Sequence, residues 1–181
     1  MILGESHYGE DDPDLTNTVL REHLEGTGRR PFFSRIASML TGKAANECDQ
    51  LAVFEKVAFY NYVQRLLPTC RVAPDQDDFD ASECAFREAL LCLKPHRIIA
   101  LGWRLYRGTP AVWADGSRAW TSLGTLEAAG KKIAVGKFHL GNFEVRTGFV
   151  NHPSSFGFSP KAWHPVTKRF VANNGPRFPG D

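Results

Sequence analysis

The chain begins Met1-Ile-Leu-Gly-Glu-Ser-His-Tyr-Gly9, a short apolar segment that meets a glycine and runs directly into titratable side chains. This order predicts a β-strand, a sharp turn and a polar loop. A second polar cluster, residues 151–155, follows the apolar residues 145–150, and a third apolar segment, residues 57–60, ends at Asn61. In an α/β sheet, loops at the carboxyl ends of strands bind ligands. The three segments therefore predict one pocket.

The rest of the chain alternates helical and strand patterns. Apolar residues recur at helical spacing, and helices are expected at residues 15–24, 33–41, 80–93 (capped by Asp80) and 159–171. Short apolar strands are expected within residues 53–60 and at 97–101, 133–135 and 145–150. This alternation predicts an α/β fold, a three-layer α/β/α sandwich with a central, mainly parallel sheet of four or five strands.

Length and composition favour one globular domain. With 181 residues, 43% of them hydrophobic and 23% charged, the chain lies in the ordinary globular range. We expect a single domain over residues 1–172. Residues 173–181 contain two prolines and two glycines and are expected to form a loose tail.

Charge and cysteine content limit the partners. A net charge of +2 does not require a polyanionic partner, but Lys and Arg outnumber Asp and Glu from Lys131 onward. That asymmetry fits a nucleic-acid-facing side, and a solvated mixed surface explains it equally well.

Four cysteines without a Cys-x-x-Cys pair favour neither a disulfide framework nor a metal site. No apolar segment approaches the roughly 18 residues that span a bilayer. We therefore expect a cytoplasmic protein with no membrane partner.

The order of several motifs resembles the uracil-DNA glycosylase superfamily over residues 4 to about 159. Residues 4–8 (Gly-Glu-Ser-His-Tyr) are similar to its first motif, and residues 30–32 (Arg-Pro-Phe) to the motif of its base-stacking aromatic. Asn61 corresponds to its base-reading asparagine. Residues 93–102 (Leu-Lys-Pro-His-Arg-Ile-Ile-Ala-Leu-Gly) resemble its Lys-Pro-x-x-Ile/Val-x-Ala-Leu-Gly segment, and residues 152–154 (His-Pro-Ser) its histidine motif. The layout is closest to the bacterial family 4-like branch, without its N-terminal cysteine pair, so neither an iron–sulfur cluster nor another cofactor is expected.

The resemblance implies a monofunctional DNA glycosylase that acts as a monomer in base-excision repair. Such an enzyme flips uracil or another deaminated base out of single- or double-stranded DNA and hydrolyses its N-glycosidic bond. Glu5 is the first candidate for positioning the water or stabilising the cationic sugar, and His7 is the competing candidate. His152 is expected to donate a hydrogen bond to the departing base.

The remaining site residues would recognise the base and the DNA. Asn61 is expected to read the base edge, Phe32 to stack on the base and Tyr8 to lie against its C5 atom. The loop after the histidine motif is expected to contact DNA and to insert an apolar wedge, Phe156, into the base stack. Its DNA-binding residues are Ser154, Ser155 and Phe156.

Two departures from the family motif leave alternatives open. Ser6 stands where members often carry Asp or Asn, and His7 stands where proline is usual. One alternative is a weak or inactive superfamily member that binds damaged DNA or a nucleotide, and another is a generic nucleotide-binding α/β protein. Structural roles are also open: Glu5 could tie down a turn, Asn61 could end a strand and Phe32 could be a core residue.

Overall fold

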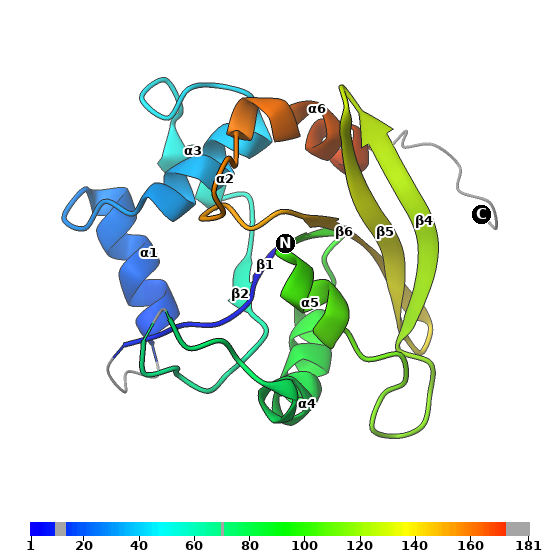
Figure 1. Ribbon diagram of the computed structural model, residues 1–181. Helices are drawn as coiled ribbons and strands as arrows, with labels where there is room; N and C mark the ends of the chain where they lie inside the picture. The colour runs from blue at the N-terminus through cyan, green and yellow to red at the C-terminus, as the bar shows by residue number, and fades with distance from the viewer. Residues whose placement is uncertain (10–13, 70, 173–181) are drawn as a thin grey trace.

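The computed structural model describes residues 1–9, 14–69 and 71–172, and the predicted tail at residues 173–181 lies outside this part of the chain. The described part contains six strands and six helices (Figure 1). The strands are β1 (Ile2–Gly4), β2 (Phe59–Asn61), β3 (Arg97–Leu101), β4 (Trp120–Ala128), β5 (Lys131–Leu140) and β6 (Phe143–Val150). The helices are α1 (Leu15–Glu25), α2 (Pro31–Thr41), α3 (Gln50–Phe54), α4 (Gln76–Leu93), α5 (Trp103–Gly108) and α6 (Pro160–Val171).

All six strands form one sheet in the order β2-β1-β3-β6-β5-β4. The first four are parallel neighbours, whereas β5 and β4 continue the sheet in antiparallel pairing. The predicted α/β fold with a mainly parallel sheet is confirmed, but the predicted number of four or five strands is wrong. Strand β4 escaped prediction because it is an edge strand in which Ser122, Gly124 and Glu127 are exposed, so its sequence lacks an apolar segment.

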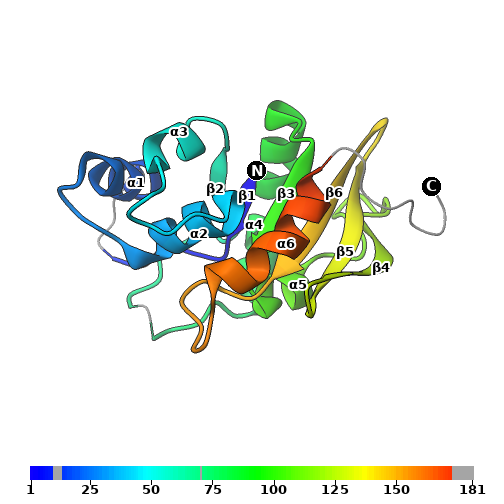
Figure 2. The same ribbon diagram turned by 90° about the horizontal axis from the view of Figure 1, so that it is seen from above.

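Helices cover both faces of the sheet. In Figure 1, α2 and α6 lie above the sheet and α4 and α5 lie below it, and Figure 2 shows the same packing from above. Strand β3 illustrates the cause, because successive side chains point to opposite faces. Ile99 and Leu101 pack in the core with α2 and α6, whereas Ile98 and Ala100 pack in the core with α4 and α5.

Local capping decides where several helices begin. The Ser159 hydroxyl accepts the backbone N–H of Ala162 and caps α6, so this helix begins where the sequence predicted. Helix α4 begins at Gln76 instead of after Asp80, because Asp75 and Asp78 accept each other's backbone N–H groups in a capping box. The strand expected within residues 53–60 is present as β2 and ends at Asn61 as predicted, but only its last residues are extended, since residues 53 and 54 belong to α3.

Candidate functional site

The ends of the four parallel strands bring distant segments together. Gly4, the last residue of β1, pairs with Asn61, the last residue of β2, and the ends of β3 and β6 pair with each other. Since these strands run in one direction, the segments that follow them leave at one edge of the sheet. These segments carry Glu5, Arg104 and His152.

A cavity of about 350 Å³, which we call the strand-end pocket, lies at this edge. Its volume is near the lower end of small-molecule sites. It is closed on one side by Leu15 and Val19 of α1 and by Phe32 and Phe33 of α2. The pocket brings together seven of the nine predicted site residues, namely Glu5, His7, Tyr8, Phe32, Asn61, His152 and Ser154.

Ser155 and Phe156 do not line the pocket. The backbone N–H of Ser155 donates to the carbonyl of His152 at 2.9 Å, and that of Phe158 donates to the carbonyl of Ser155 at 3.2 Å. These bonds form tight turns that leave the Phe156 side chain fully exposed.

Glu5 is held in a fixed orientation by an arginine from another strand end. The carboxylate is buried, with 9% of the residue exposed, and its Oε2 accepts a hydrogen bond from Nε of Arg104 at 2.8 Å. Arg104 lies in α5, directly after β3. The pair compensates part of the cost of burying the carboxylate. It also leaves Oε1 without a bond to this guanidinium.

His152 is arranged to be a neutral hydrogen-bond donor. The backbone N–H of Ser154 donates to Nδ1 of His152 at 3.2 Å, so the neutral ring carries its proton on Nε2. Burial lowers the pKa of His152, and the positive charge of Arg104 lowers it further. Gly102, with φ 113, passes close to the Cβ of His152, a backbone conformation that glycine tolerates best.

Phe32 packs against the imidazole of His152. The two ring centroids are 5.3 Å apart and the planes differ by 30°. This separation leaves no slot for a third ring between them, so a bound planar ligand would lie beside the pair or displace Phe32. Phe33 and Phe59 meet Phe32 edge-on and fix its position.

Asn61 presents an amide at the end of β2. The residue is 7% exposed, and its Nδ2 donates a long hydrogen bond of 3.5 Å to the hydroxyl of Thr16 in α1. A Cβ at position 4 would collide with Oδ1 of Asn61. Glycine at the end of β1 therefore lets the amide lie directly against the neighbouring strand.

His7 and Tyr8 form the outer part of the pocket. Burial lowers the pKa of His7, which favours the neutral imidazole. Tyr8 is half exposed and its backbone bridges to Leu67. Both side chains line the cavity, and Glu5 is held by Arg104 and not by either of them. The structure therefore places both predicted candidates, Glu5 and His7, at the pocket.

Three residues of the site could not be assigned to it from the sequence. Arg104 contacts Glu5, Thr16 contacts Asn61, and Arg30 lines the pocket while pairing with Glu22 at 3.7 Å. For Arg104 the sequence did contain a signal that was not used: it lies just after Gly102, at the end of a predicted buried strand, where side chains reach the same edge of the sheet as the other strand ends. No comparable signal existed in the sequence for Thr16, which lies in the first turn of α1.

The described residues contain neither a metal cluster nor a membrane-spanning helix. Among residues 1–9, 14–69 and 71–172, no three His, Cys, Asp or Glu side chains are grouped so as to hold a metal ion. Within the same ranges, every helix is too short or too polar to cross a bilayer. Comparison of the sequence with protein-family models gave no match, and no curated protein matches it significantly.

Proposed function

We propose that this protein is a DNA glycosylase that hydrolyses the N-glycosidic bond of uracil or another deaminated base. The observation that carries the proposal is the strand-end pocket, in which a buried carboxylate, an amide and a neutral histidine from three separate strand ends line one cavity with an aromatic ring. A planar base offers a hydrogen-bonding edge for the amide and a face for the ring.

The chemistry of the reaction matches these groups. The bond between C1′ and the base nitrogen breaks with both electrons leaving on the base, so negative charge develops on the base oxygens and positive charge on the sugar. The Nε2–H of His152 would stabilise the base oxygen by a hydrogen bond. A preorganised donor of this kind contributes roughly two to three orders of magnitude in rate.

Water then adds at C1′ and gives up a proton to the group that holds it or to solvent, and the departing base anion takes up a proton from solvent, so that free base and an abasic sugar are formed. Glu5, which is buried at the pocket and oriented by Arg104, is the stronger candidate for holding this water, and His7 is the alternative. The negative charge of Glu5 would also stabilise the cationic sugar. Its pairing with Arg104 weakens both effects.

Base choice would depend on Asn61. Its amide oxygen would accept N3–H of uracil and its amide nitrogen would donate to O4. Cytosine presents the reverse pattern at these positions, and each unpaired buried polar group costs about 1–3 kcal/mol. In this proposal the protein acts as a cytoplasmic monomer, and DNA is its partner.

A second function is favoured by the Glu5–Arg104 pair. A guanidinium 2.8 Å from the carboxylate neutralises much of the charge that cleavage would use. The alternative is therefore a protein that captures a damaged or flipped base without releasing it.

One experiment separates the two functions. Purified protein is incubated with single- and double-stranded oligonucleotides that contain uracil or hypoxanthine, and the free base is quantified by chromatography. Base release that His152→Ala abolishes supports the glycosylase. Binding to abasic DNA without release of any base supports the alternative, and the absence of both contradicts the two proposals together.

A further inference from the structure

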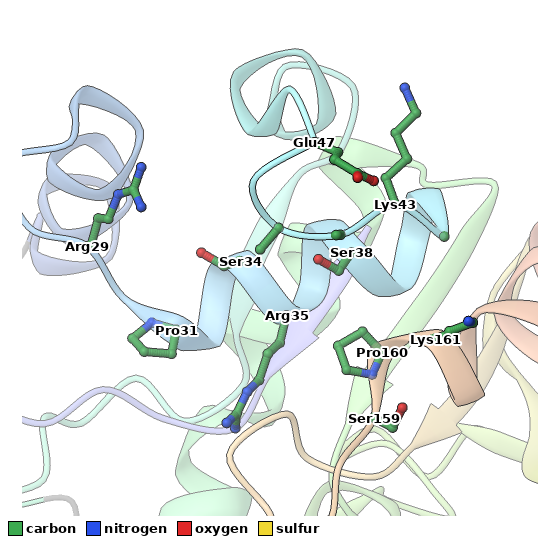
Figure 3. A pocket seen from close by; sticks show the side chains of 13 residues that line it. Arg29, Pro31, Ser34, Arg35, Ser38, Lys43, Glu47, Ser159, Pro160 and Lys161 are labelled. Atoms are coloured by element: carbon green, nitrogen blue, oxygen red, sulfur yellow. The ribbon is translucent and has the colours of Figure 1, made fainter.

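A second and larger cavity lies next to the strand-end pocket. It has a volume of about 720 Å³ and lies between α2, the segment after it and the start of α6 (Figure 3). We call it the basic groove, after the four cationic residues that line it, Arg29, Arg35, Lys43 and Lys161.

The charge of the groove is not internally compensated. Its lining contains four cations and one carboxylate, Glu47, and among the described residues none of the four cations pairs with a carboxylate. Arg30, the next residue after Arg29, differs, because it pairs with Glu22 at 3.7 Å. Unpaired cations around a hollow attract anions. The N-terminus of α6, which carries the partial positive charge of the helix dipole, also borders the groove, since Ser159 and Pro160 line it.

A hydroxyl in the groove also lacks a partner. Ser38 of α2 is only 6% exposed and lines the groove. Its hydroxyl has no hydrogen-bond partner among the described residues. Figure 3 shows its side chain on the face of α2 that looks across the groove towards Ser159 and Pro160. Within the described part of the chain, Oγ1 of Thr147 is the one fully buried side-chain oxygen or nitrogen without a partner, so the Ser38 oxygen is accessible from the groove, and its O–H can donate to an oxygen acceptor of a ligand.

The groove and the strand-end pocket are neighbours that share the first turn of α2 as a wall. Along this segment, Arg29 and Pro31 line the groove, whereas Arg30 and Phe32 line the pocket. Arg35, which lines the groove, also contacts the histidine loop, because its Nη1 donates to the carbonyl of Pro153, the residue after His152, at 2.7 Å. A chain that leaves the pocket and crosses this wall would therefore reach the groove.

We propose that the basic groove binds phosphate groups of the same single DNA strand whose base occupies the strand-end pocket. This inference rests on the proposed function, because it takes the pocket to hold a base. The phosphates would be held by Lys43 and Lys161 as mobile charges, by the guanidinium of Arg29 and by the O–H of Ser38. Such a strand needs no sequence-specific contact in the groove.

The test measures binding of single-stranded DNA that carries a central abasic analogue, by fluorescence anisotropy over a range of salt concentrations. An oligonucleotide of about 16 nucleotides reaches both cavities, whereas a trinucleotide serves as a probe of the pocket. In the Lys43→Gln/Lys161→Gln variant, the slope of log affinity against log salt should decrease by about 0.7 for each phosphate that no longer meets a cation. Ser38→Ala should bind the long oligonucleotide roughly tenfold more weakly.

The matched control is Arg71→Gln/Arg118→Gln, which removes two exposed cations that line neither cavity. It should keep the parent's slope, and trinucleotide binding should be equal in all variants. An unchanged slope in the groove variant overturns the proposal. A groove variant that no longer binds inorganic phosphate, but still binds the oligonucleotide like the parent, also overturns it and assigns the groove to a free phosphate ligand.

Failure of the proposed function would look different. If the parent protein releases no base but the groove variant still lowers the salt dependence of binding, the groove holds DNA and the catalytic proposal is wrong. If base release is normal and the groove variant matches the control, only the groove proposal is wrong.

Discussion

The strand-end pocket and the basic groove share helix α2 but hold their polar groups in opposite ways. In the pocket, Glu5 is bonded by Arg104, and the ring of His152 receives the N–H of Ser154. In the groove, the cations have no carboxylate partners among the described residues. The hydroxyl of Ser38 likewise forms no hydrogen bond with another described residue. Side chains held in a fixed geometry are suited to catalysis on a bound base, whereas unpaired cations are suited to attracting the phosphate backbone of DNA. Substitutions in the two regions should therefore affect different steps.

The largest expected effect is on the chemical step in the pocket. Removing the donor in His152→Ala should lower single-turnover cleavage of uracil-containing DNA by roughly two to three orders of magnitude, because the charge on the departing base is then without its stabilising hydrogen bond. Binding to abasic DNA should change little. The control is His96→Ala, which removes an exposed histidine outside the pocket. Equal decreases in cleavage and binding would contradict a role confined to the transition state.

A smaller effect is expected on base choice. Asn61→Asp replaces the amide donor by an acceptor, so O4 of uracil would face a carboxylate oxygen. Uracil release should fall about ten- to a hundredfold, which corresponds to roughly 1–3 kcal/mol, and weak release of cytosine should appear. Initial rates on matched uracil and cytosine oligonucleotides measure both, with exposed Asn46→Asp as the control. Unchanged uracil kinetics would remove Asn61 from base recognition.

A substitution at the exposed Phe156, which lines neither cavity, tests whether this side chain contributes to the capture of duplex DNA. In Phe156→Ala, affinity for duplex DNA with an abasic analogue should fall about tenfold, because the wedge that offsets unstacking is removed. Affinity for the single strand should stay at the parent's value, since it needs no unstacking. Leu51→Ala, which shortens an exposed apolar side chain on α3, provides the comparison. A decrease on both substrates would assign Phe156 to general DNA binding.

Much of the pocket was predictable from sequence because it depends on where strands end. The segments ending at Gly4, Asn61 and Val150 are apolar and short, and parallel pairing places their ends at one edge. The prediction of one pocket from these three ends agrees with the observed cavity. The roles assigned to its residues stay predictions.

Other features depend on contacts that no local pattern encodes. The partner of Glu5 lies 99 residues away in the chain, and the stacking of Phe32 on His152 joins α2 to a distant loop. The basic groove was missed for the same reason, since Lys43 and Lys161 approach only when α2 packs against α6. The edge strand β4 was missed because many of its side chains are exposed, so its sequence contains polar residues and no continuous apolar segment.

The smallest expected effect is a change in pH dependence at the Glu5–Arg104 pair. In the parent, burial and then the charge of Arg104 lower the pKa of His152. The neutral donor is therefore present at neutral pH and disappears only when the pH falls through this lowered pKa. Arg104→Gln removes the positive charge and leaves the negative charge of Glu5 without its partner. Both changes raise the pKa of His152, since each favours the protonated ring.

The acid limb of the single-turnover pH–rate profile should then move to higher pH in Arg104→Gln, while the rate on the alkaline side of that limb changes by a few-fold at most. Titration of the imidazole followed by NMR reports the same shift independently of cleavage. Arg107→Gln removes an exposed cation from the same helix and should leave both measurements unchanged. If Arg104→Gln leaves the imidazole titration where it is in the parent, Arg104 orients Glu5 without influencing His152.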